Sequence, residues 1–398
     1  MKSELILNNS IINNETVDLQ SILADAHKKK LRPLCNCSSA EPPMYIAYMS
    51  GKYLVKRMPG SGKDHHSDCE SYEIPAELSG RGELEDSAIN EDKETGNTKL
   101  KLDFSTSKML SNRSAPVQSG EPQDQVKADS TKLSILSFLH LLYEDAALNK
   151  WNINTKHSWF SIREGLYQAC ETKVVKNKAL KDSLYIPETF KLDNKDAIER
   201  RRKTFLSDFK PEAKKQNIGV LIGEIKAIES ARYGYKLIIK HMPSAPVFMS
   251  EDVFKKINKN FPFELSMFNE NERIHLLTVC AFLLTPSGNL QVETISFMTV
   301  DKNWIPFSTI EEFDLIQSIY DKKRSFIKGL RYNLSQKKVI ASLVFTDCEK
   351  PQALYLIPPK ANDEYYQELD NVINDSDLDS IKIDLNDDEY SLDVLLAP

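Results

Sequence analysis

The chain has no hydrophobic run that could cross a membrane and no segment that resembles a leader peptide. Its longest clear apolar stretch covers residues 276–284, whereas a membrane-spanning helix needs about 20 apolar residues. The first ten residues contain one lysine and only a very short apolar run, unlike a secretory signal, which joins a basic start to an apolar segment. We therefore expect a cytoplasmic protein without membrane contact.

Cysteine is scarce as well. Six cysteines in 398 residues do not make a disulfide scaffold of the kind that stabilises small secreted domains. This scarcity favours a reducing compartment. Hydrophobic residues make up 41% of the chain, which is enough for ordinary cores, and the length suggests two or three domains.

Familiar catalytic signatures are missing too. The sequence contains no Gly-x-Ser-x-Gly, no dinucleotide-binding glycine pattern and no Cys–His pair outside the segment described next. Residues 59–63, PGSGK, resemble a phosphate loop, but they lack its GxxxxGK[ST] spacing, and Asp64 stands where Ser or Thr would bind Mg²⁺. The sequence therefore indicates a non-enzymatic protein more than an enzyme.

Half of the cysteines lie in one short segment, residues 32–73. Cys35 and Cys37 open it, and His65, His66 and Cys69 close it. Zn²⁺ prefers four thiolate or imidazole ligands in a tetrahedron. Residues i and i+2 of an extended segment share one face, and a histidine three or four residues before a cysteine shares one face of a helical turn. The segment predicts a structural Zn²⁺ site; the alternative is three reduced cysteines beside a solvated His-His pair.

Between the two pairs of ligands, the sequence predicts a β-hairpin. Residues 44–49 and 53–58 are strand-like, and Ser50-Gly51 fits a two-residue turn. Such a hairpin would carry the second pair of ligands back toward the first.

Six phrases of the sequence carry a resemblance to a known family: RPLCNC, PMYIAY, VKRMPGSG, HHSDCESYE, WIPF at 304–307 and RSFIKGLRYN at 324–333. They resemble an uncharacterised bacterial family, domain of unknown function 1173, usually encoded on plasmids and integrative elements. The resemblance covers most of residues 30–358 and leaves out the acidic end of the chain. It implies that Cys35, Cys37 and Cys69 are the family's three N-terminal cysteines and that His65, rather than His66, belongs to its HxxxC phrase.

The periodicity of the chain predicts an α+β fold in sections. Helices are expected near residues 16–29, 133–143, 160–170 and 196–206, and a clear hairpin over 274–300. The expected sections are an N-terminal helix and zinc-stabilised hairpin module (1–76), a polar linker with one possible strand (77–130), a helical section (131–210), a C-terminal mixed α/β domain (216–360) and an acidic tail (361–398).

Charge is distributed unevenly along the chain. Residues 361–398 hold twelve acidic residues and one lysine, so the first 360 residues carry a net charge of +5 although the whole chain carries −6. A mildly basic body with an acidic tail is typical of nucleic-acid-associated proteins. A disordered acidic tail would then compete with nucleic acid for the basic surface; the alternative is a tail that only keeps the protein soluble.

One dense basic run stands out in the helical section. It consists of Arg200, Arg201, Arg202 and Lys203. Such a run suits contacts with phosphate groups, and a solvated helix face is the alternative. The two helices expected on either side of the loop at residues 152–157 are also compatible with a winged-helix DNA-binding domain.

Residues 309–357 resemble the core of restriction-endonuclease-like nucleases. Thr309 and Glu312 predict a helix start, three strands follow, and Asp347 closes the middle one. Active enzymes of that class add a Glu-x-Lys on the next strand, where carboxylates bind a divalent metal and the lysine helps to activate water. Here that position, residues 354–356, reads LYL. The resemblance implies a degenerate core without cleavage; the alternative is an unrelated α/β unit.

Glu224 and Lys226 form a Glu-x-Lys pair elsewhere in the chain. No strand that carries an aspartate precedes this pair at a suitable distance, so a surface ion pair is the alternative. The pair nevertheless keeps a displaced metal-carboxylate site open.

These features predict a non-catalytic, zinc-binding protein of a bacterial mobile element that binds DNA, RNA or a nucleoprotein partner of the element. The first alternative is a metal-dependent nuclease with a displaced active site, which would use Glu224 and Lys226. The second is a protein–protein adaptor without nucleic-acid contact, in which the basic run at 200–203 has no ligand.

Overall fold

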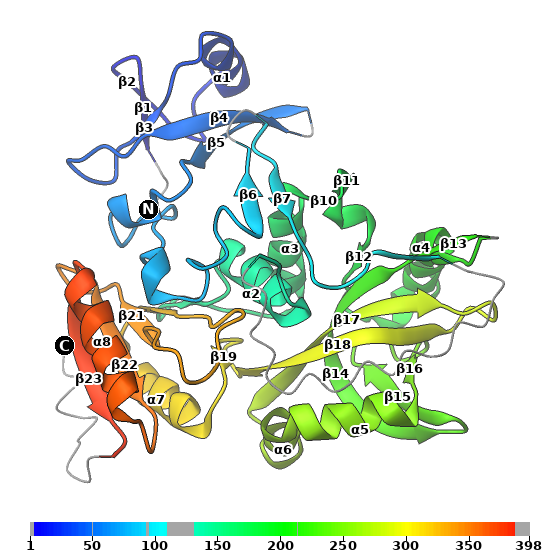
Figure 1. Cartoon of the computed structure of the whole chain (residues 1–398). Coiled ribbons are helices and arrows are strands. Elements are labelled where there is room, and N and C mark those ends of the chain that lie inside the picture. Colours follow the sequence, from blue (N-terminus) through cyan, green and yellow to red (C-terminus); the bar gives the residue numbers. More distant parts are fainter. Residues whose placement is uncertain (1–3, 50, 93–94, 110–130, 213, 387–398) are drawn as a thin grey trace.

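An N-terminal module, a closed barrel and an open five-stranded sheet make up the fold, with helices α2 and α3 between them (Figure 1). The structure is a computed structural model that describes residues 4–49, 51–92, 95–109, 131–212 and 214–386. The expected α+β class is confirmed.

The N-terminal module combines a three-stranded sheet, one helix and the expected hairpin. The sheet has the order β2-β1-β3, and the hairpin pairs β4 with β5. Helix α1 packs Leu23 and Ala26 against apolar side chains of the sheet and of β4. The helix expected near 16–29 and the two hairpin strands are confirmed. The bounds are β1 (Leu5–Leu7), β2 (Ser10–Ile12), α1 (Leu19–Lys28), β3 (Leu34–Cys35), β4 (Met44–Met49) and β5 (Lys52–Arg57).

The middle of the chain contains the three expected helices, α2 (Ile135–Asp145), α3 (Trp159–Cys170) and α4 (Lys195–Leu206). Ser134 and Ser158 cap the first two, because their side chains accept backbone N–H groups of the first turn. Short strands between the helices pair with strands of distant sections, so shared sheets join the sections. In the part of the chain that the structure describes, no helix has both the length and the apolar character needed to cross a bilayer.

The described part of the polar stretch from 77 to 130 contains three short strands instead of the single one expected. Strands β6 (Ile89–Glu91) and β7 (Thr98–Leu100) form a sheet with β10 (Lys173–Val175) and β11 (Lys178–Ala179), while β8 (Ser107–Met109) pairs with β13 (Lys215–Asn217). Thr98 and Leu100 are buried and Lys99 between them is exposed, which is the period of a half-buried strand. Residues 110–130 of the expected linker lie outside the described residues.

Five strands close into a barrel. Strand β14 pairs with β15, β15 with β16, β16 with β18, β18 with β17, and β17 with β14 again. Every pairing in this ring is antiparallel except that of β16 with β18, which is parallel. The barrel strands are β14 (Gly219–Ala231), β15 (Gly234–Ile239), β16 (Val247–Met249), β17 (Ile274–Leu284) and β18 (Leu290–Asp301).

Helices α5 (Glu251–Asn260) and α6 (Pro262–Glu270) connect β16 to β17 and lie below the barrel in Figure 1. Ser250 caps α5 by accepting the N–H of Val253. Two short strands attach outside the ring, β12 (Leu184–Tyr185) on β14 and β19 (Pro306–Phe307) on β18.

Strand β17 is apolar on both faces because it separates two cores. Leu276 and Cys280 belong to the core inside the barrel, whereas Leu277 and Val279 belong to the core that contains α2 and α3. This two-sided burial explains the continuous apolar run at 276–284. The hairpin expected over 274–300 is confirmed as β17 and β18.

The five-stranded sheet has the order β23-β22-β21-β20-β9 and a helix on each face. Phe326 and Leu343 pack with α7, whereas Ile327 and Val344, one position later in each strand, pack with α8; this is the alternation of a strand buried on both sides. The bounds are β9 (Lys150–Trp151), α7 (Ile310–Asp321), β20 (Phe326–Lys328), β21 (Leu343–Phe345), β22 (Gln352–Ile357), α8 (Asp363–Asp375) and β23 (Asp379–Asp384).

The acidic end of the chain differs from the tail that we expected. Helix α8 and strand β23 occupy most of residues 363–384, and β23 extends the five-stranded sheet parallel to β22 (Figure 1). The acidic residues lie on the outer sides of these elements, while Tyr365, Leu369 and Ile383 are buried. Despite their high charge, residues 363–384 carry an apolar stripe at helical spacing in α8 and alternating apolar residues in β23. A disordered tail over all of residues 361–398 is therefore wrong.

Leu369→Ala tests this packing. Removing a fully buried leucine side chain from α8 should lower the free energy of unfolding by about 2–5 kcal/mol, measured by urea denaturation. Gln367→Ala, at an exposed position of the same helix, should change it by less than about 0.5 kcal/mol. Equal, small effects of both substitutions would contradict the packing of α8.

Candidate metal centre

Four side chains from two separate segments meet beside the N-terminal sheet. Strand β3 ends at Cys35, and Cys37 follows two residues later. The β4–β5 hairpin then returns the chain to a short 3₁₀ helix, Gly62–Asp64, which ends at His65. A turn closed by the Cys69 N–H and the His66 carbonyl brings Cys69 to the same place. The second pair of ligands thus sits on a 3₁₀ end and a turn, not on the helical turn that we expected.

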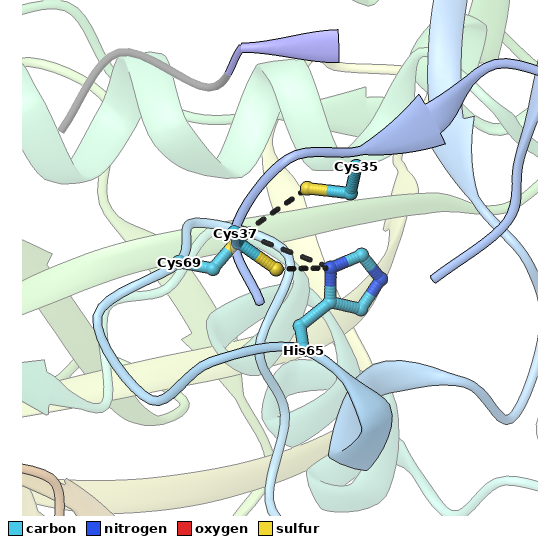
Figure 2. Close-up of side chains that lie close together, drawn as sticks. All are labelled: Cys35, Cys37, His65 and Cys69. Atoms are coloured by element: carbon cyan, nitrogen blue, oxygen red, sulfur yellow. Dashed lines mark hydrogen bonds between the residues drawn. The ribbon is translucent and has the colours of Figure 1, made fainter. Parts of the chain in front are cut away.

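The potential ligand atoms of Cys35, Cys37, His65 and Cys69 all lie within 4.8 Å of one another. Figure 2 shows the three sulfur atoms gathered around the imidazole of His65. The Cys35 and Cys69 Sγ atoms are 3.7 Å apart, and His65 Nδ1 lies 3.5 Å from Cys37 Sγ and 3.7 Å from Cys69 Sγ. These four residues can hold one metal ion, with His65 binding through Nδ1.

The surroundings of the cluster suit a charged metal–thiolate group. Cys35 and His65 are almost fully buried, and burial raises the pKa of the Cys35 and Cys69 thiols and lowers that of His65. A metal ion favours thiolate and neutral imidazole instead, so its binding would release the thiol protons. The backbone N–H groups of His66 and Ser71 point at Cys37 Sγ and Cys69 Sγ, each at 3.4 Å, and would stabilise the thiolates.

His66 points away from this cluster. Its Nδ1 accepts the N–H of Asp68 at 3.2 Å, and its side chain is half exposed. His65 instead lies inside, with its Nε2 buried and without a hydrogen-bond partner. The geometry therefore favours His65 over His66 as the fourth ligand.

The cluster joins the N-terminal module to the body of the protein. Cys35 belongs to the module's sheet, whereas Cys69 packs with Tyr72 and Ile74 in the core under α8. A metal ion at this point would cross-link two parts that have separate hydrophobic cores.

The family model described as "Protein of unknown function (DUF1173)" matches residues 6–381. The chain belongs to this family. No curated protein and no solved structure matches the chain. The match runs past residue 358, where the resemblance of the sequence phrases ended, and includes α8 and part of β23. The folded acidic segment is thus part of the DUF1173 region.

The four predicted basic residues of α4 differ in their surroundings. Arg201 forms a bidentate pair with Glu188 at 2.8 and 2.6 Å. Arg202 is buried and donates to Ser244 Oγ at 3.0 Å. Arg200 and Lys203 are exposed. Arg201 is exposed too, but Glu188 compensates its charge, so Arg200 and Lys203 suit a phosphate contact better.

The two acidic groups of the nuclease-like core do not share a site. Glu312 Oε1 accepts Lys328 Nζ at 2.9 Å, and its Oε2 accepts the N–H and the hydroxyl of Ser308. Asp347 pairs with Arg324 at 3.0 Å instead. Among the described residues, the Cys–His cluster is the only group of three or more potential ligands close enough to bind a metal. The degenerate nuclease core is not shown by this arrangement.

Lys328 is a buried charge that the sequence analysis did not single out. Burial lowers the pKa of Lys328. Burial also opposes ionisation of Glu312, but Lys328 lowers its pKa below the usual value. The pair lines a cavity of about 140 Å³ together with His140 and Arg331. Since two of the three Lys328 N–H groups bond to Glu312 and the Gly329 carbonyl, both charges are already compensated within the protein.

Glu224 is the centre of a second buried network, which replaces the expected pair with Lys226. Its Oε1 accepts Lys240 Nζ at 2.7 Å and lies 2.8 Å from His275 Nδ1. The His275 ring stacks on Trp304 at 4.3 Å. Lys226 is exposed, at a bulge in the pairing of β14 with β15. The prediction of a surface ion pair between Glu224 and Lys226 is therefore wrong, because the Glu224 side chain is buried in the protein and the Lys226 side chain is exposed.

Nothing in the local sequence indicates this network. Its members are separated by up to 51 residues and meet only because β14 pairs with both β15 and β17. His275 offers the one usable signal, since it places an imidazole in a mainly apolar strand.

Substitutions at the cluster test the metal site. Cys37→Ser and His65→Ala should each reduce bound metal from about one ion per chain to nearly none, because a structural site needs all four ligands; elemental analysis of the purified protein measures this. Cys348→Ser, a half-buried cysteine elsewhere, and His66→Ala should leave the metal content unchanged. Wild-type protein without metal, or full retention in Cys37→Ser, would contradict the site.

Glu224→Gln tests the second network through its pH dependence. Burial opposes ionisation of Glu224, but hydrogen bonds from His275 and Lys240 lower its pKa below the usual value. A lowered carboxyl pKa stabilises the fold above the unfolded pKa of about 4.3, and this contribution disappears as pH falls through the folded pKa.

At neutral pH, Glu224→Gln should reduce the free energy of unfolding by about 1–3 kcal/mol. The difference from wild type should shrink below about pH 4. Glu229→Gln, at an exposed position of the same strand, should have an effect below about 0.5 kcal/mol. A difference for Glu224→Gln that is independent of pH would refute the role of its charge.

Proposed function

We propose that this DUF1173 protein is a non-catalytic, zinc-stabilised protein that binds nucleic acid, alone or within a nucleoprotein complex of a mobile element. The topology of the barrel carries the proposal, and the metal cluster and the distribution of charge support it. The link to mobile elements rests on the resemblance of the sequence to its family.

The set of three thiols and one imidazole favours zinc as the metal, and the distances between these groups are compatible with it. Bond lengths of about 2.3 Å for Zn–S and about 2.0–2.1 Å for Zn–N place tetrahedral ligands about 3.8 Å (S to S) and 3.6 Å (S to N) apart. Of the six separations between the four ligand atoms, one sulfur–sulfur distance is 3.7 Å and two sulfur–nitrogen distances are 3.5 and 3.7 Å, and all six are within 4.8 Å. Four protein ligands leave no open position, so the role of the ion is structural.

The barrel has the strand order of the oligonucleotide- and oligosaccharide-binding barrel. In that fold, five strands pair in the order 1-2-3-5-4-1, strands 3 and 5 are parallel, and a helix links strands 3 and 4. Here β14 to β18 take these places, β16 and β18 are parallel, and α5 and α6 fill the helical connection. This likeness rests on strand order and direction, and function needs support from the surface of the barrel.

The charge near the barrel supports a polyanionic ligand. Residues 226–249 hold four basic residues and one acidic residue. Helix α4 contacts the loop between β15 and β16, where Arg202 and Glu199 both hydrogen-bond to Ser244. The exposed Arg200 and Lys203 therefore lie on a helix attached to the barrel at the loop between β15 and β16.

The nuclease alternative finds no support in the described residues. Glu224 is neutralised by Lys240, Glu312 by Lys328, and Asp347 by Arg324. A metal-dependent nuclease needs carboxylates that are free to bind a divalent ion. The alternative of a protein–protein adaptor differs from the proposal in that it predicts no binding to nucleic acid, which a binding assay measures.

Fluorescence anisotropy with labelled DNA and RNA tests the proposal. Affinity of the full chain should fall as salt rises from about 50 to 200 mM, because each phosphate contact releases counterions. Arg200→Gln combined with Lys203→Gln should weaken binding and reduce the salt dependence. Lys28→Gln combined with Lys30→Gln, two exposed lysines of the N-terminal module, should not. The absence of binding to every nucleic acid at low salt would refute the proposal and favour the adaptor.

A further inference from the structure

The barrel has one wall that is buried and one that is open. Outward residues of β14 and β17, such as Val220, Ile222 and Val279, belong to the core around α2. On the other side, the second half of β14, strands β15 and β16, and the first half of β18 carry outward residues that are exposed or half-buried. We call this second surface, residues 226–238, 248 and 291–294, the open wall.

The open wall ends in a two-residue turn that displays an aromatic ring. Arg232 and Tyr233 connect β14 to β15 between the paired Ala231 and Gly234. The Tyr233 side chain is 80% exposed, and the Arg232 guanidinium lies over its ring at 5.2 Å from the centroid. Gly234, with a φ of +93°, permits this turn, because a Cβ there would lie 2.4 Å from the Met249 carbonyl.

A continuous row of side chains crosses the wall below the turn. The strand register places Glu229 opposite Lys236, Lys236 opposite Phe248, and Phe248 opposite Gln291. Lys236 and Phe248 are half-buried and Gln291 is exposed. The row thus offers one cation paired with a carboxylate, one aromatic edge and one amide on the same wall as the exposed Tyr233.

These groups suit a nucleic acid whose bases are unpaired. An exposed aromatic ring can stack on an unpaired base, whereas the bases of a duplex are already stacked on each other. Lys226 and Arg232 are basic residues of the same surface. Its two acidic residues are paired, Glu229 with Lys236 at 3.0 Å and Glu293 with Lys108 at 2.9 Å. The charge therefore matches a phosphate backbone running beside the aromatic residues.

We infer that the open wall binds single-stranded nucleic acid, with Tyr233 stacking on a base and Arg232 contacting the backbone. The inference rests on the proposed function and gives it a ligand class and a site. In oligonucleotide-binding barrels, the face of strands 2 and 3 and the loop between strands 1 and 2 bind the ligand; these correspond to β15, β16 and the Arg232–Tyr233 turn.

The test uses the full chain with its metal and fluorescein-labelled oligothymidylate or oligouridylate of about 20 nucleotides, longer than the roughly 4–16 nucleotides that one barrel covers. A duplex of the same length is the comparison. Tyr233→Ala should weaken single-strand binding by about tenfold or more, and Tyr233→Phe, which keeps the ring, should restore it. Arg232→Gln should reduce the salt dependence by about one phosphate contact.

Phe160→Ala is the matched control, since Phe160 is a 64% exposed aromatic residue on α3, away from the open wall. It should bind as tightly as wild type. Circular dichroism of each variant confirms that the fold is retained, which is expected because Tyr233 and Phe160 are exposed.

The other outcomes separate the inference from the proposed function. Single-strand binding that Tyr233→Ala leaves unchanged, or equal affinity for the duplex, overturns the inference while the protein remains a nucleic-acid binder. Absence of binding to the single strand and to the duplex overturns both the inference and the proposed function. Self-association that Tyr233→Ala abolishes, without nucleic-acid binding, assigns the open wall to a second copy of the chain and also overturns both.

Discussion

The pairing of β14 with β17 is the constraint on which most of the structure depends. It closes the barrel, and it turns the outer faces of both strands toward α2, so that the barrel and the helical section share a core. Both faces of β17 are mainly apolar, so a shift of its register by one residue would still place apolar side chains on each face. The polar contact between Glu224 and His275 specifies the register of the β14–β17 pairing, which apolar packing alone does not. A shift by one residue would leave the buried Glu224 carboxylate without His275 as a partner.

The metal cluster has a comparable role at the other end of the molecule. The N-terminal module holds only a small core around Leu7, Leu23 and Ile46, and small cores supply little stability without a cross-link. Cys35 and Cys69 belong to different packing units and meet at 3.7 Å. A structural ion at this point would hold the module against the segment that enters the core under α8.

Several residues that look functional in the sequence are engaged in structural ion pairs. Glu312, Asp347 and Glu224 each have a nearby cation, and two of the four basic residues at 200–203 are paired or buried. The reason is the cost of burying a charge without a partner, which is far larger than the gain from a surface contact. Tyr233 and Arg232 of the open wall are both exposed, and they form a turn that no recognised motif marks.

Local sequence determined the elements whose signals are periodic or chemical. Serine caps and apolar stripes specified α2, α3 and α5, alternation specified the β4–β5 and β17–β18 hairpins, and ligand chemistry specified Cys35, Cys37, His65 and Cys69 as one group. The family phrase favoured His65, and the geometry of the turn agrees because His66 faces solvent.

Only the tertiary structure decided which strands meet. Closure of the barrel needs β14 to pair on both edges with strands up to about 60 residues away, and no local pattern encodes a partner at that distance. The folded acidic end has the same origin: its charges predict a solvated tail, but Tyr365, Leu369 and Ile383 become a core only when the five-stranded sheet offers a surface to cover. Burial of those few apolar side chains on the sheet stabilises the helix and the strand, and the charged neighbours remain in contact with water on the outer side.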